Sequence, residues 1–289
     1  MSKRKGVICA ILAAAFYALN APLSKVLLTD TPPTMMAAFL YLGAGFGMLA
    51  LRVTGLGHAR QEPRLTRREL PDTIAMVLLD IAAPIALMAG IARTSAANAS
   101  LLNNFEIVAT SLIAFGIFRE PISRRLWLGI GLVTLSSFIL SAGDVAALSL
   151  SAGSLLVLLA CVCWGFENNC TRRLSSKDPV QIVVIKGIFS GLGALIIALA
   201  VGESFPGIWS ILCALALGFV AYGLSIALYI YAQRELGAAK TSAYYAVSPF
   251  IGVAMSLIIF REIPSLSFLV ALVVMIAGTW VVTMADQAS

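Results

Sequence analysis

The chain has 289 residues, of which 60% are hydrophobic and 12% are charged, and its formal net charge is +6. Its mean hydropathy is +0.95. Soluble domains carry roughly 45–50% apolar and about 25% charged residues, so this composition excludes an ordinary soluble globular protein.

The predicted elements are ten apolar segments, each near the length of about 20 residues that a helix needs to cross the hydrocarbon core. In chain order they cover residues 6–28, 34–53, 72–92, 95–117, 126–142, 152–171, 181–201, 208–231, 239–260 and 266–284. The first is too long for the apolar region of a signal peptide, so we expect it to remain as a helix. We therefore predict an all-α membrane protein with ten transmembrane helices and no soluble domain.

The sequence repeats itself. The stretches FREPIS at 118–123 and FREIPS at 260–265 match at an offset of 142 residues. Near the N-terminus, an offset of 147 pairs Gly6 with Gly153 and Pro32 with Pro179. Such internal symmetry is typical of transporters whose site lies where two related halves meet. We predict one five-helix repeat over residues 1–148 and a second over residues 149–289. Because each half has an odd number of spans, the second half is inverted in the membrane.

Basic residues are concentrated on one side of the predicted membrane. With a cytoplasmic N-terminus, sixteen of the 20 Lys and Arg residues fall on the cytoplasmic side: Lys3, Arg4, Lys5, Arg52, Arg60, Arg64, Arg67, Arg68, Arg119, Arg124, Arg125, Arg172, Arg173, Lys177, Arg234 and Lys240. Cytoplasmic loops of membrane proteins carry this excess, so we predict cytoplasmic termini and a location in the inner (plasma) membrane. The positive charge orients the chain, and we expect no nucleic-acid partner.

The cysteines do not indicate a metal site. All five lie in apolar segments without paired spacing, and the single histidine, His58, lies in a predicted loop. Zinc sites need clustered Cys and His ligands, so we expect small packed thiols, no metal and no cofactor.

Three carboxylates lie at predicted membrane depth: Asp80, Glu106 and Glu167. An ionisable side chain there costs about 2.5–3.5 kcal/mol on insertion scales, so each needs a reason. For Glu106 and Glu167 we predict a functional role. Asp80 has a structural alternative, because Lys25 or Lys186 could neutralise it.

Polar residues recur at helical spacing in both halves. Asn103, Glu106 and Thr110 share one helical face and correspond to Tyr245, Ser248 and Gly252. In the same way, Tyr17, Asn20 and Ser24 correspond to Trp164, Glu167 and Thr171, and Asp80 to Tyr222. The predicted substrate-binding set is Tyr17, Asn20, Asp80, Asn103, Glu106, Trp164, Glu167, Tyr222, Tyr245 and Ser248. The alternative is structural: asparagines such as Asn103 join helices in membrane bundles, and the aromatic residues serve as buried or interfacial anchors.

Other patterns concern packing. Three prolines are expected to interrupt helices, and two glycine pairs at i, i+4 spacing allow close helix approach: Pro22, Pro84, Pro249, Gly43 with Gly47, and Gly187 with Gly191. Glu120 and Glu262 lie at helix ends beside arginine, where a salt bridge or a helix cap is expected. The segments 126–142 and 266–284 have no charged residue at mid-depth and are expected to be peripheral.

On these residues the chain resembles the EamA-like exporters of the drug/metabolite transporter superfamily over roughly residues 6–284. The resemblance rests on Tyr17-Ala18 and Trp164-Gly165, on Pro32 and Pro179, and on the Phe-Arg-Glu endings at 118–120 and 260–262. It implies a 5+5 inverted repeat, a central cavity and alternating access, with amino acids or small metabolites as substrates. Glu167 and the Asn103-Asn104-x-Glu106 cluster depart from the family pattern.

We therefore expect a secondary active transporter, an exporter or exchanger of a small cationic or zwitterionic metabolite such as an amino acid or amine. A ring face and a carboxylate together suit an ammonium group. Either carboxylate could instead carry a coupling proton, because burial disfavours its charged form. A lipid-headgroup flippase of the same fold is the alternative; an integral membrane enzyme is a more remote one, since neither Gly-x-Ser-x-Gly nor His-Glu-x-x-His is present. We expect no enzyme activity and a monomer, with a dimer left open.

Overall fold

The computed structural model describes residues 3–54, 63–94, 99, 102–103, 105–142, 152–248, 250–252, 254–255 and 266–287. Within these ranges the regular secondary structure is entirely helical. Among the described residues, six helical segments are long and apolar enough to cross a membrane: Arg4–Leu27, Pro33–Val53, Arg67–Arg93, Ala152–Leu174, Pro179–Ala200 and Ile208–Leu236. The prediction of an all-α membrane protein is confirmed, whereas ten spans remain a prediction. Several residues discussed above lie outside the described ranges, among them His58, Arg60, Asn104, Pro249 and Glu262.

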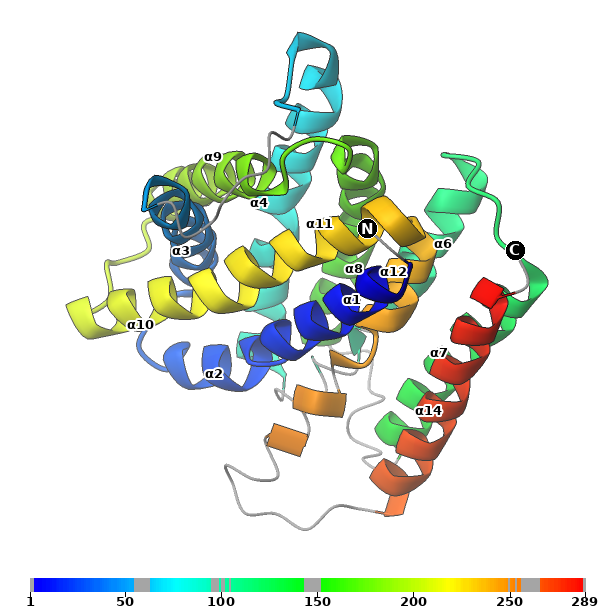
Figure 1. Cartoon of the computed structure of the whole chain (residues 1–289). Coiled ribbons are helices and arrows are strands. Elements are labelled where there is room, and N and C mark those ends of the chain that lie inside the picture. The colour runs from blue at the N-terminus through cyan, green and yellow to red at the C-terminus, as the bar shows by residue number, and fades with distance from the viewer. Residues whose placement is uncertain are drawn as a thin grey trace.

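Figure 1 shows the described helices, coloured in chain order. Before residue 150 they are α1 (Lys3–Tyr17), α2 (Asn20–Leu27), α3 (Pro33–Val53), the 3₁₀ turn η1 (Arg67–Glu69), α4 (Leu70–Arg93), α6 (Phe105–Gly116) and α7 (Arg124–Ala142). After it come α8 (Ala152–Leu174), α9 (Pro179–Ala200), α10 (Ile208–Gly218), the π-helix η2 (Phe219–Leu224), α11 (Ser225–Leu236), α12 (Ala238–Tyr245) and α14 (Leu266–Gln287).

The first predicted segment is two helices instead of one. α1 ends at Tyr17 and α2 begins at Asn20. Pro22 has no N–H to donate to the carbonyl of Ala18, four residues earlier, so the hydrogen-bond ladder fails where the helix breaks. Pro84, by contrast, lies inside the uninterrupted α4, and the expected interruption there is wrong. One missing hydrogen bond is tolerated in a long helix that packs against neighbours such as α8 and α9.

Helices distant in sequence pack together. α3 packs against α9, α4 against α8, and α1 against α11. α7 and α14 pack mainly on each other, and they lie along one edge of the molecule (Figure 1). Their peripheral position agrees with the expectation from their lack of charged residues. The helices before and after residue 150 are therefore interleaved, and side chains from both sets meet in the interior.

Two glycine pairs allow this close approach. A Cβ atom at Gly43 would lie 2.1 Å from the carbonyl oxygen of Leu215 in α10, and one at Gly187 would lie 2.3 Å from the backbone nitrogen of Gly45 in α3. No side chain fits at either position without displacing backbone. The small-residue patterns thus mark real helix contacts, as the sequence predicted.

The end of α6 contacts the start of α12. The Glu120 carboxylate accepts a hydrogen bond of 3.3 Å from the backbone nitrogen of Ala238, the first residue of α12. The cap expected at Glu120 is present, but it caps a helix more than 100 residues away in the chain instead of its own.

Candidate functional site

A cavity of about 40 Å³ lies in the interior, among α1, α3, α6, α8, α9, α11, α12 and η2. Its wall combines six aromatic rings with charged and polar groups: Tyr17, Tyr41, Glu106, Trp164, Glu167, Asn168, Thr171, Lys186, Tyr222, Ile226, Tyr229 and Tyr245. A water molecule needs roughly 10–15 Å³ of such volume, so the cavity has room for a few waters. An organic solute enters only if side chains or helices move.

The aromatic rings form a continuous cluster around Tyr17. Its ring centroid lies 5.5 Å from that of Tyr245, 5.7 Å from that of Tyr222 and 6.4 Å from that of Trp164. Tyr229 extends the cluster, 4.9 Å from Tyr245. Rings at these separations stabilise one another and offer electron-rich faces, which attract cations.

A buried ion network joins α4, α8 and α9. The Lys186 ammonium lies 3.1 Å from Asp80 Oδ2 and 2.8 Å from Glu167 Oε1. Tyr41 donates a 2.8 Å hydrogen bond to Asp80 Oδ1, and Thr171 donates to Glu167 Oε1. Asp80, Glu167 and Lys186 are each at most 3% exposed. Of the two lysines proposed to neutralise Asp80, the partner is Lys186; Lys25 instead donates to the carbonyls of Ile91 and Thr94.

Glu106 lies at the start of α6 and is held by α8. Its Oε1 accepts a 2.7 Å hydrogen bond from Asn168 Nδ2, which also donates to Thr110 Oγ1 at 3.3 Å. Glu106 is partly exposed to the cavity, unlike Glu167. Among the described residues no basic side chain forms an ion pair with it.

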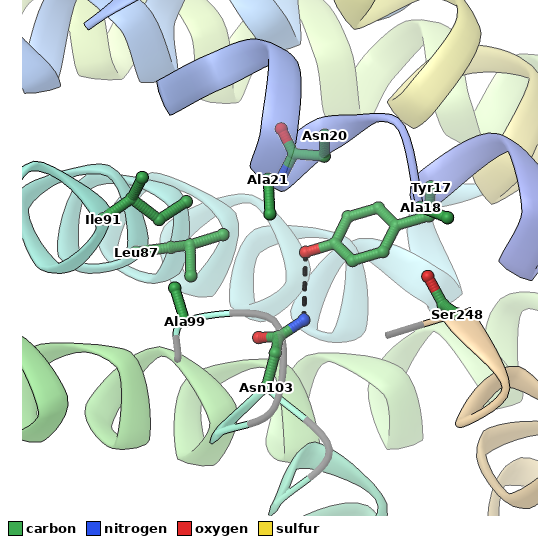
Figure 2. Close-up of a pocket in the computed structure, with 9 residues that line it drawn as sticks. All are labelled: Tyr17, Ala18, Asn20, Ala21, Leu87, Ile91, Ala99, Asn103 and Ser248. Carbon is green, nitrogen blue, oxygen red and sulfur yellow. Dashed lines mark hydrogen bonds between the residues drawn. The ribbon is translucent and has the colours of Figure 1, made fainter. Parts of the chain in front are cut away.

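Two smaller cavities of about 20 Å³ each share wall residues with this one. In the first, Asn103 donates a 3.2 Å hydrogen bond to the Tyr17 hydroxyl, and Asn20, Ala18 and Ser248 complete the surroundings (Figure 2). Asn20 also donates to the Tyr222 hydroxyl at 3.0 Å and accepts from Ser24 at 2.9 Å. The break between α1 and α2 places Tyr17 and Asn20 on this wall.

Nine of the ten predicted site residues line these three cavities, and Asp80 lies behind Lys186. The set of substrate-binding residues predicted from the sequence did not include four residues of the cavity wall: Tyr41, Asn168, Lys186 and Tyr229. Lys186 had a signal, because an ionisable residue in an apolar segment is costly wherever it lies. Tyr41 had none, since a tyrosine in an apolar helix usually marks ordinary packing.

A polar layer separates the cavity from a larger hollow of about 850 Å³, which Asn169, Arg172, Glu120 and Lys240 help to line. Asn168 lines the cavity and Asn169 the hollow. Gln233 of α11 donates to the Asn168 carbonyl at 2.9 Å, and Asn169 donates to the Thr110 carbonyl at 3.1 Å. Asn169 Oδ1 and Gln233 Oε1 are buried with no hydrogen-bond partner. The layer therefore closes the cavity on this side at some energetic cost.

No group of three His, Cys, Asp or Glu side chains that could hold a metal occurs within the described ranges. The site chemistry is that of its rings, amides, carboxylates and one ammonium.

Comparison with known proteins identifies the family. The model of the EamA-like transporter family matches residues 4–142 and 151–284, and the chain belongs to that family. An uncharacterized transporter of Methanothermobacter thermautotrophicus is 29% identical over 97% of this chain and 87% of its own length. The uncharacterized inner membrane transporter YedA of Escherichia coli is 26% identical over 78% of this chain and 72% of its own. The protein is therefore a multi-pass membrane transporter.

The fold is shared with solved structures. One crystal structure superposes with a TM-score of 0.82 at 13% identity and covers 99% of both chains. At that identity the likeness concerns the arrangement of helices and carries nothing about the substrate.

Proposed function

We propose that the protein is a secondary active transporter that moves a small cationic or zwitterionic organic metabolite across the inner membrane by alternating access. The observation that carries the proposal is the cavity among helices from both halves of the chain. It places Glu106 and Glu167 in one wall with the rings of Tyr17, Trp164 and Tyr245. Concave sites with a few polar groups in an apolar wall are the usual form of a small-molecule site.

The charge balance of the site supports a positively charged solute. Asp80, Glu106 and Glu167 face one lysine, Lys186. If all are ionised, the group carries two negative charges more than positive ones. A solute cation or a proton can supply the balance, so we propose that outward movement of the solute is exchanged for protons.

The helix pairing supports an inverted repeat. The contact of α4 with α8 has a counterpart in that of α11 with α1, and α3 pairs with α9. By the sequence offsets, these contacts exchange under a two-fold relation between residues 1–148 and 149–289. The relative YedA is named an inner membrane transporter, and the sequence excess of basic residues on one side supports cytoplasmic termini.

The proposal is tested with purified protein in sealed proteoliposomes, preloaded with single unlabelled amines or amino acids and assayed for uptake of the labelled solute. We expect at least one cationic or zwitterionic solute to exchange, and an acidic interior to accelerate its accumulation, because protons leave the vesicle as the solute enters. If the pH gradient does not accelerate accumulation, the transport is not coupled to protons.

Glu106→Gln is expected to abolish the exchange while the protein still unfolds at its normal temperature. Asp30→Asn is the matched control, because Asp30 is an exposed carboxylate away from the cavity walls. Normal exchange by Glu106→Gln would place the site elsewhere. Movement of fluorescent lipid between the leaflets, without exchange of any soluble solute, would identify the flippase alternative instead.

A further inference from the structure

The cavity treats its two kinds of charge differently. Lys186 is the one basic side chain in the described wall, and its ammonium already contacts Asp80 at 3.1 Å and Glu167 at 2.8 Å. With 3% of its surface exposed, it is closed in by these two carboxylates. A carboxylate on a solute would have to displace one of them and would then face the remaining negative charge.

Glu106 is the reverse case. Its side chain is partly exposed to the cavity and accepts a hydrogen bond from the neutral amide of Asn168. Within the described ranges it forms no ion pair. It lines both the main cavity and the smaller one beside Ser242. A buried carboxylate without a counter-ion attracts a cation strongly, because little water screens the interaction.

The rings next to Glu106 complete a cation site. Tyr17 and Tyr245 line both cavities with Glu106, and their ring centroids are 5.5 Å apart. Tyr229 lies 4.9 Å from Tyr245 on the same wall. Tyrosine faces beside a carboxylate are the chemistry that recognises alkylated ammonium groups, which have little hydrogen-bonding capacity and a large apolar surface.

Resting on the proposed function, we propose that the substrate is an organic cation without a carboxylate, whose alkylammonium group binds Glu106 within the Tyr17–Tyr229–Tyr245 rings. Lys186 stays with Asp80 and Glu167 when it binds. The site therefore rejects zwitterions of the same size and ammonium group.

Matched solutes test this in the purified full-length protein. Choline and glycine betaine share a trimethylammonium group, and only the betaine has a carboxylate; ethanolamine and glycine form a second pair. We expect a cation to raise the thermal unfolding temperature and its zwitterion at equal concentration to leave it unchanged. The Glu106→Gln variant should lose the shift, with affinity reduced roughly tenfold or more, whereas Asp30→Asn keeps it.

The ring contribution is tested at one position. Tyr17→Phe retains the ring face and is expected to retain the shift, whereas Tyr17→Leu loses both. A zwitterion that shifts the unfolding temperature as much as its cation, or the absence of a shift with both cations, overturns the inference. Exchange of the zwitterions in proteoliposomes would then leave the proposed function intact. If no solute is exchanged at all, both this inference and the proposed function are contradicted.

Discussion

Lys186 holds together three helices through two carboxylates. Its salt bridges to Asp80 and Glu167 join α9 to α4 and α8 in an interior where uncompensated charge is expensive. At the position that corresponds to Glu167, Asn20 forms a neutral pair with Tyr222 instead. The helix pairs on the two sides of the site are therefore joined by different chemistry, charged on one side and neutral on the other.

Removal of Lys186 is expected to destabilise the protein strongly. Lys186→Met should lower the free energy of unfolding by about 3–5 kcal/mol, because it leaves two buried carboxylates without a partner. Adding Asp80→Asn and Glu167→Gln to the same chain should restore most of the loss. Unfolding in detergent measures both variants. A triple variant as unstable as the single one would mean that packing of the lysine chain, not its charge, is what matters.

At the scale of the helices, the sequence predicted where elements lie better than where they bend. Within the segment 6–28 the break between α1 and α2 could be read only from Pro22, and Pro84 gives the same signal in an unbroken α4. Whether a proline breaks a helix depends on packing around it. The π-helix that contains Tyr222 left no pattern in the sequence; such turns often occur at functional sites.

Substitutions at two glycines distinguish the effect of close helix packing on stability from the effect of helix propensity. Gly43→Ala should lower the free energy of unfolding by about 1–3 kcal/mol, because its Cβ atom would lie 2.1 Å from the Leu215 carbonyl oxygen. Gly131→Ala in α7 is the matched control, since nothing lies within 4 Å of a Cβ atom there. It should be neutral or stabilising by up to about 1 kcal/mol. Equal losses in both variants would contradict the close packing of α3 on α10.

The interior layer that contains Asn169 and Gln233 closes the cavity toward the hollow of about 850 Å³. Both side chains leave a buried oxygen without a partner. Because such an oxygen costs about 1–3 kcal/mol, the closed layer is poorly stabilised, which suits an element that must open. Gln233→Leu removes both the unpartnered oxygen and the hydrogen bond to the Asn168 carbonyl, so the closed layer loses the cost that favours its opening. We expect slower solute exchange in proteoliposomes and little change in the free energy of unfolding, and unchanged exchange would contradict a role of this layer in opening.

For the whole molecule, the membrane orientation is predicted from the distribution of basic residues alone. Cysteine labelling tests this orientation directly. Ser176 lines the hollow, and Ser204 lies exposed in the connection between α9 and α10. In a cysteine-free chain, Ser176→Cys should react with an impermeant thiol reagent from the cytoplasm and Ser204→Cys from the outside. The opposite pattern would reverse the orientation, and labelling of both from one side would rule out a span between them.

The composition and the repeat were sufficient to predict an all-helical membrane protein and six of the twelve residues that line the cavity of about 40 Å³. Glu106 and Glu167 were identified because an ionisable side chain at membrane depth costs free energy, and the repeat offsets added Trp164 and Tyr245. The sequence could not show that Lys186 engages Asp80 and Glu167 together, because this depends on how α4, α8 and α9 meet. The sequence therefore did not distinguish Glu167, which forms an ion pair with Lys186, from Glu106, which is partly exposed to the cavity.

The central claim is that the cavity opens to each side of the membrane in turn, and thiol accessibility at Ala18 tests it most directly. Ala18 lines the cavity of Figure 2 and is 5% exposed. In a cysteine-free chain, Ala18→Cys should react slowly with an impermeant reagent in the absence of solute, and much faster from either side during exchange. Ala10→Cys, at a fully buried position of α1, should stay unreactive throughout. Reaction from one side only, or a rate that exchange does not change, would contradict the claim.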